Sequence, residues 1–171
     1  MTLEKMIIKE INIKEIITKS KLPDTDYVAN PYVGCQIGCK YCYAEFMKRF
    51  TGHTEDWGQF LDVKVNAAET IPPGKFKGKT ILFSSVTDPY LPLEAKYKIT
   101  RQVLEALIEE QPHIGILTKS RLVVRDIDIL KKFKKIDVGV SISTLNEKYS
   151  RELEPLSSPP KLRIEALKQC K

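Results

Sequence analysis

The sequence contains no long apolar run, no internal repeat and few cysteines, and each absence excludes a class of protein. No segment reaches the roughly 20 consecutive apolar residues of a membrane-spanning helix. The start, MTLEKMIIKEINIKEII, is interrupted by charges where a signal peptide would carry an apolar core. We therefore expect a cytoplasmic protein with no membrane partner. Three of the four cysteines fall within eight residues, which is unlike a secreted disulfide scaffold and makes metal binding the better first hypothesis.

The composition is that of an ordinary globular protein. Of the 171 residues, 42% are hydrophobic and 29% are charged, which excludes disordered and collagen-like classes and predicts a single domain over residues 1–171. The formal net charge of +6 permits a polyanionic partner. The basic residues are spread along the chain without a compact basic run, so most of them are expected to form solvated surface.

Hydrophobic periodicity predicts alternating strands and helices. Extended segments are expected at residues 26–34, 80–86, 114–118 and 136–143, and helices at residues 41–50, 97–110, 123–130 and 160–169. A turn-rich insertion with one strand at residues 62–65 is expected over residues 51–79.

This alternation predicts an α/β fold with a parallel sheet, whose functional loops lie at the carboxyl ends of the strands. About four βα units are present, and four strands cannot close a barrel of the usual eight, so we expect either an open sheet or a partial TIM-type (β/α) barrel with part of the molecule missing. The fourth strand alternates apolar residues with small polar ones, which is typical of a barrel interior near a ligand.

The cysteine cluster is the strongest chemical signal. Cys35, Cys39 and Cys42 stand in the string GCQIGCKYCYAEF, where two glycines allow the backbone to turn tightly. Three thiolates holding a 4Fe-4S cluster leave one iron open to an exogenous ligand, which suggests catalysis. The alternative is a structural zinc site completed by Cys170 or His53, although zinc ribbons and fingers use paired C-x2-C units and a second pair is absent from this sequence.

This spacing, with an aromatic residue before the third cysteine, resembles the signature of the radical S-adenosylmethionine (radical SAM) enzymes. The segments NPYVGCQIGCKYCYAEF, SSVTDPYLPLEAKYKITRQVLEAL, ILTKS, VSIST and LEP resemble the branch related to spore photoproduct lyase, often labelled DNA repair photolyase-like. The resemblance begins at about Asn30 and spans most of the chain.

The resemblance implies an enzyme of lyase or oxidoreductase type that binds a 4Fe-4S cluster and S-adenosylmethionine. One electron delivered through the cluster would cleave the sulfonium to methionine and a 5'-deoxyadenosyl radical, which abstracts hydrogen from a substrate. The cofactors carry the difficult chemistry, so the protein residues of interest bind and orient them. An electron donor of flavodoxin or ferredoxin type and a nucleic-acid substrate are the partners that this resemblance suggests.

Candidate cofactor-binding residues follow from the same resemblance. Tyr41 would lie by the adenine, and Thr87 and Asp88 replace a Gly-Gly-Glu segment that holds the methionyl amine in many relatives. Lys119 matches a lysine that contacts the methionyl group. The competing interpretations are a packed aromatic for Tyr41, an ordinary turn residue for Asp88 and a solvated cation for Lys119.

Ser141 matches a serine that contacts the cofactor, and Ser143 on the same strand face is a second choice; both could instead simply fill the barrel interior. Tyr43 matches a tyrosine that returns hydrogen in spore photoproduct lyases, and is the candidate catalytic residue. Val86 stands where those enzymes have a hydrogen-donor cysteine, which argues against repair of a thymine dimer by their route.

The length is a second departure, because radical SAM enzymes of this type usually need six βα units. We expect the domain to be incomplete at its carboxyl-terminal end. Two alternatives to an active enzyme remain at this stage: a zinc module without catalysis that binds nucleic acid, and a fragment that keeps the cluster but not turnover.

Overall fold

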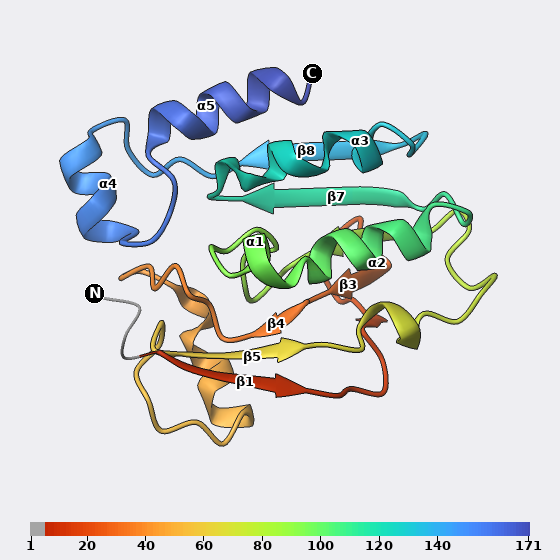
Figure 1. The fold of residues 1–171 in the computed structure, drawn as a ribbon, viewed down its shortest axis with the longest axis horizontal. Helices are drawn as coiled ribbons and strands as arrows, with labels where there is room; N and C mark the ends of the chain where they lie inside the picture. Colours follow the sequence, from red (N-terminus) through yellow and green to blue (C-terminus); the bar gives the residue numbers. More distant parts are fainter. Residues whose placement is uncertain (1–5) are drawn as a thin grey trace.

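Four parallel strands within the predicted segments form one five-stranded sheet together with an antiparallel strand that was not predicted, and the end of the predicted segment 26–34 joins a second sheet. The structure is a computed structural model that describes residues 6–171, so the first five residues of the charge-interrupted start lie outside it. The sheet order is β2-β3-β6-β7-β8, with β2 antiparallel and the remaining neighbours parallel (Figure 1). The α/β class and the partial barrel are confirmed. The strand bounds are β2 (Ile17–Lys19), β3 (Tyr27–Ala29), β6 (Thr80–Phe83), β7 (His113–Thr118) and β8 (Ile136–Val140).

A second sheet has three strands in the order β1-β5-β4. Strand β1 (Ile7–Ile11) pairs parallel to β5 (Phe60–Lys64), and β4 (Tyr32–Val33) pairs antiparallel to β5. The strand expected at residues 62–65 therefore exists with an earlier start, but it belongs to a sheet with the amino-terminal segment instead of standing alone in an insertion. Strand β1 was not predicted, since its IIKEI sequence lacks regular alternation and its residues are mostly exposed.

Two predicted strands end earlier than expected. Strand β6 stops at Phe83 because Ser84 has a φ of 68°, which no extended strand can accommodate. Strand β8 stops at Val140, the partner of the last residue of β7, Thr118. Ser141 and Ser143 therefore lie after the strand, not on its polar face as predicted.

The helix predicted at residues 97–110 is shorter than expected and covers residues 99–107, because Lys98 adopts a left-handed conformation with a φ of 55° that separates it from a short helix ending at Tyr97. The buried Glu94 carboxylate accepts the backbone N–H groups of Thr100 at 3.2 Å and Arg101 at 3.4 Å, and so caps the second helix. The helices are α1 (Glu94–Tyr97), α2 (Ile99–Leu107), α3 (Ile127–Leu130), α4 (Glu147–Leu153) and α5 (Pro160–Gln169), with 3-10 helices η2 (Tyr43–Phe50), η3 (Ala68–Thr70) and η4 (Arg121–Asp126).

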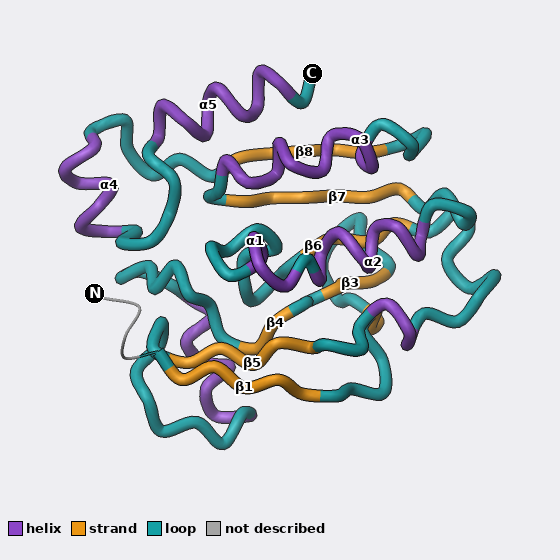
Figure 2. Tube along the Cα trace, in the orientation of Figure 1, coloured by secondary structure: helices purple, strands orange, loops and turns teal. Residues whose placement is uncertain are grey.

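The core lies between the sheets and the helices that cover them. Figure 2 shows α1, α2 and α3 in front of the strands in this view. Buried side chains of α2 pack with the inner residues of β6 and β7 in one apolar cluster, whose members include Val103, Leu104, Leu107, Ile81, Phe83, Ile114 and Ile116. Within residues 6–171, the structure has no helix that is both long and apolar enough to span a membrane.

Candidate functional site

The cysteine loop follows β4 directly and is shaped by two glycines. Gly34 and Gly38 have φ values of 83° and 62°, a region that side chains disfavour. A Cβ at Gly34 would lie 2.6 Å from the carbonyl oxygen of Phe60, so only glycine fits between the loop and β5. The backbone N–H of Cys42 donates to the carbonyl of Cys39 at 3.2 Å, which closes the second turn. The loop thus presents its cysteines on one side.

The three cysteines line one cavity of about 140 Å³ at the carboxyl ends of β6, β7 and β8. This is where functional loops of a parallel α/β fold are expected. Eight of the ten predicted site residues line this cavity, and the two that do not are Tyr41 and Ser143. The lining predicted residues are Cys35, Cys39, Cys42, Tyr43, Thr87, Asp88, Lys119 and Ser141.

The segment after β6 carries an unsatisfied hydroxyl into this cavity. Ser84 is 9% exposed and holds a strained positive φ, and its hydroxyl has no hydrogen-bond partner in the described structure. Such strain persists where the surrounding structure imposes it and gathers at functional sites. Asn30 imposes it here, because its side-chain oxygen accepts the backbone N–H groups of Ser85 at 3.0 Å and Val86 at 3.2 Å. Sequence reasoning assigned no role to Asn30, although an asparagine before a proline is a turn signal.

The side chains of Thr87 and Asp88 form hydrogen bonds with other segments of the chain. The Thr87 hydroxyl donates to the carbonyl of Gly34 at 2.7 Å and so ties the cysteine loop to β6. The buried Asp88 carboxylate accepts the Thr118 hydroxyl at 2.6 Å and the Lys119 backbone N–H at 2.8 Å. It also accepts the backbone N–H of Tyr90 at 2.9 Å. Burial raises the pKa of Asp88, while these hydrogen bonds oppose the rise.

The two tyrosines next to the cysteines have different surroundings. Tyr43 is 70% exposed, and its hydroxyl donates to the carbonyl of Ser85 at the cavity edge. Tyr41 points its hydroxyl at the carboxylate of Glu154, outside the cavity lining, and its pKa is raised by burial and by this carboxylate. Ser143 is exposed and does not line the cavity either.

Burial and a nearby cation have opposite effects on the thiols of the cavity. Burial raises the pKa of the Cys35 thiol to about 12 and that of Cys39 to about 11, and Lys119 opposes the rise at Cys39. The Lys119 ammonium also lies 6.0 Å from the centre of the Tyr41 ring. Thiols in such surroundings are protonated at neutral pH, so binding of a metal cluster must displace protons from them.

The donor set fits a cluster better than a single zinc ion. Among residues 6–171, no group of three or more histidine, cysteine or acidic side chains is arranged to hold one metal ion. A cuboidal cluster differs in that each thiolate binds its own iron. The fourth ligands considered for zinc lie elsewhere: Cys170 lines a different cavity beside Phe133 and Leu167. His53 stacks on Phe60 at 4.0 Å and pairs with Asp62 and Glu55.

A family comparison agrees with this geometry. Residues 29–171 match the model of the Radical SAM superfamily, so the chain belongs to that superfamily.

Three relatives each match three quarters or more of this chain. An uncharacterized protein of Methanocaldococcus jannaschii is 42% identical over 164 residues, covering 96% of this chain and 62% of that protein. An uncharacterized protein of Acidianus two-tailed virus is 36% identical and covers 85% of this chain and 51% of its own length. A protein of Pseudomonas phage M6 described as a radical SAM Nalpha-GlyT isomerase is 32% identical over 132 residues, 75% of this chain and 27% of its own. The chain thus spans 62% and 51% of the lengths of these first two relatives.

Solved structures show the same fold. Spore photoproduct lyase complexed with dinucleoside spore photoproduct matches with a TM-score of 0.69 at 17% identity, covering 95% of this chain and 47% of that one. A double mutant of the same enzyme with bound AdoMet and dinucleoside spore photoproduct matches with a TM-score of 0.65 at 18% identity, over the same shares of both chains. At this identity the likeness establishes the fold alone.

Proposed function

We propose that this chain holds a 4Fe-4S cluster through Cys35, Cys39 and Cys42 and binds S-adenosylmethionine beside it to initiate radical chemistry. One observation carries the proposal: the three cysteines share a cavity with an ammonium group, Lys119, and with the unpartnered hydroxyl of Ser84. When bound, these cofactors would supply one-electron cleavage of the sulfonium and a 5'-deoxyadenosyl radical.

The protein's part is to bind, orient and exclude water. The Lys119 ammonium and the hydroxyls of Ser84 and Ser141 are the groups offered to the charged ends of the methionyl moiety. Asp88 acts through the backbone, since its carboxylate holds the N–H of Lys119. In this proposal the hydroxyls of Ser84 and Ser141 take the place of the Gly-Gly-Glu segment of other relatives, and the Asp88 carboxylate holds the backbone of Lys119.

Val86 and Leu117 supply apolar surface to the same cavity. A valine has no thiol hydrogen to donate, so we do not propose thymine-dimer repair by the route of spore photoproduct lyase. Tyr43 is the tyrosine among the described residues that line the cavity, and it is the candidate for hydrogen return.

We extend the proposal to a nucleic-acid substrate and to an electron donor of flavodoxin or ferredoxin type. Two observations support nucleic acid: the net charge of +6, and a structural neighbour described in complex with a dinucleoside. A base within a duplex would have to be flipped out to reach the cavity.

The first experiment is anaerobic reconstitution with iron and sulfide, followed by dithionite and S-adenosylmethionine, with 5'-deoxyadenosine as the product measured. Wild type should form it and Cys39→Ala should not. Cys170→Ala is the matched control, because that thiol lines another cavity and should leave the yield unchanged. A colourless protein with stoichiometric zinc and no iron-sulfur absorption would overturn the proposal.

The same preparation separates catalysis from cofactor binding. A stable cluster that yields no 5'-deoxyadenosine would mean that this length of chain binds the cluster without turnover. Joining the carboxyl-terminal portion of the Methanocaldococcus jannaschii relative should then restore product formation.

A further inference from the structure

A buried ion pair lies behind the cysteine loop. The side chains of Glu154 and Arg163 are both 0% exposed, and an oxygen of the carboxylate lies 2.6 Å from the guanidinium. The two groups form an ion pair, but the angles at this contact do not meet those of a hydrogen bond. Taking two charges out of water is costly, so a buried pair is a poor device for stability alone and raises the question of what else it orders.

The pair reaches the proposed cofactor site through one phenol. The other carboxylate oxygen of Glu154 accepts a hydrogen bond from the hydroxyl of Tyr41, the residue directly before the third cysteine. The Tyr41 side chain is half exposed, so much of its ring has no protein neighbour. A hydrogen bond at its tip therefore restricts a side chain that would otherwise sample several rotamers.

The same region ties the cysteine loop to the sheet. Residues 153–158, which we call the strap, join α4 to α5. The backbone N–H of Lys40 donates to the carbonyl of Leu153 at 2.9 Å, and that of Leu156 to Ile37 at 3.4 Å. At its other end the strap meets β7, where the N–H of Ser158 donates to the carbonyl of Lys119 at 3.0 Å.

Arg163 fastens this strap to the end of β8. Its guanidinium donates to the carbonyl of Ser158 at 2.5 Å and to that of Ser141 at 2.7 Å. One cation thus holds the strap, the segment after β8 and, through Glu154, the phenol of Tyr41.

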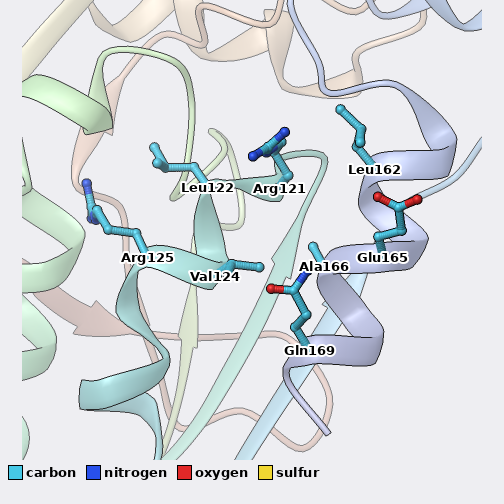
Figure 3. Close-up of a pocket in the computed structure, with 8 residues that line it drawn as sticks. All are labelled: Arg121, Leu122, Val124, Arg125, Leu162, Glu165, Ala166 and Gln169. Atoms are coloured by element: carbon cyan, nitrogen blue, oxygen red, sulfur yellow. The ribbon is translucent and has the colours of Figure 1, made fainter.

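Helix α5, which carries Arg163, also contacts η4. Figure 3 shows Leu162, Glu165, Ala166 and Gln169 of α5 facing η4 across a hollow of about 270 Å³. Arg163 does not line this hollow, and it contains no cysteine. Arg163 therefore projects from a helix that packs against η4 and β8.

We propose that Glu154 and Arg163 are positioning residues that hold the Tyr41 ring in the orientation needed to bind the adenosyl part of S-adenosylmethionine. Neither residue lines the cavity, and both act through the Tyr41 hydroxyl. Preorganising a side chain in its bound rotamer improves affinity by removing an ordering cost from the binding step. This inference rests on the proposed function, because the Tyr41 ring can serve S-adenosylmethionine only if that cofactor binds beside the cysteines; Lys119, which lines the cavity, has its ammonium 6.0 Å from the centre of the ring.

Tyr41→Phe tests the inference without disturbing the buried pair, because it removes only the hydroxyl. In anaerobically reconstituted, unreduced protein, we expect the Kd for S-adenosylmethionine to rise about tenfold, as for loss of one charge-assisted hydrogen bond. Glu154→Gln should raise the Kd similarly, and the double variant should be no weaker than the weaker single one. Iron and sulfide content should equal that of wild type. Tyr149→Phe and Glu165→Gln, exposed residues outside this cavity, are the matched controls.

A second readout needs no cofactor. In protein labelled with 13C-tyrosine, the signal missing from Tyr41→Phe identifies Tyr41, and Glu154→Gln should shift that signal while leaving the other tyrosines in place. Unchanged affinity in Tyr41→Phe, or additive losses in the double variant, would overturn the inference and leave the proposed function standing. If wild type fails to bind S-adenosylmethionine, the proposed function fails and the inference falls with it.

Discussion

Replacing Arg163 by methionine should strongly destabilise the fold. Arg163 and Glu154 are fully buried partners, and removing one member of such a pair leaves the other as an uncompensated buried charge. The usual loss is about 3–5 kcal/mol. The carbonyls of Ser141 and Ser158 also lose their donor, which makes the upper part of this range the expected value.

Urea unfolding followed by circular dichroism measures this loss, and a thermal scan should show the midpoint falling by about 6–20 °C for a chain of this size. Two further variants isolate the cause. Adding Glu154→Gln should recover part of the stability, because the unpaired charge is gone. Arg151→Met is the matched control, since that guanidinium is 76% exposed, lies 3.9 Å from Glu147 and should change stability by less than about 1 kcal/mol. The reasoning is refuted if Arg163→Met and Arg151→Met have equal effects.

Three other predictions concern the site's supports. Gly34→Ala should lower stability and cluster yield together, because its Cβ would lie 2.6 Å from the Phe60 carbonyl at a φ of 83°; unfolding midpoint and iron content measure this. Asp88→Asn should weaken S-adenosylmethionine binding measured by calorimetry, because an amide cannot accept from both Thr118 and the Lys119 backbone through two oxygens. Burial lowers the pKa of Lys64 to about 8, so wild-type stability relative to Lys64→Met should rise between pH 8 and 10.5 by at most about 3 kcal/mol, measured by urea unfolding.

The sign for Lys64 follows from proton counts. In this pH window the folded protein has released the Lys64 proton while the unfolded chain keeps it, so raising the pH favours folding. A pH-independent difference between wild type and Lys64→Met would contradict the expected burial. For the other two variants the controls are Gly74→Ala, a positive-φ glycine with open space around its Cβ, and Asp128→Asn, which lies on α3 outside the cavity. Gly34→Ala with the stability of Gly74→Ala would show that Phe60 can move aside. An Asp88→Asn affinity equal to that of Asp128→Asn would show that the carboxylate does not position Lys119.

Local patterns in the sequence were sufficient for the parallel strands and for the cysteine loop. The apolar runs at residues 80–86 and 114–118 predicted β6 and β7, because strands buried in a parallel sheet carry that signature. The alternation of apolar and small polar residues at 136–143 predicted β8. The predicted ends were wrong by a few residues where tertiary contacts intervene, as at Ser84, whose strained conformation depends on Asn30, more than fifty positions away.

The residues of the site also fall into those that local sequence identifies and those whose contacts depend on tertiary packing. Cysteine spacing is a local property, and it identified Cys35, Cys39 and Cys42, which the structure brings to one cavity. The partners of Asp88, Tyr41 and Arg163 could not be read from the chain, since each bond joins segments brought together only by the packing of strands and helices.

The sequence alone therefore determined the chemistry available to this protein, through a loop whose glycines and thiols lie within nine residues, 34–42. The tertiary structure decided which polar groups near this loop remain free to bind a ligand. Ser84 keeps an unpartnered hydroxyl in the cavity, while the Asp88 carboxylate is bound by its neighbours and the Tyr41 phenol is bound to Glu154. Burial and hydrogen bonding between distant segments make that selection, and neither is encoded in residue spacing.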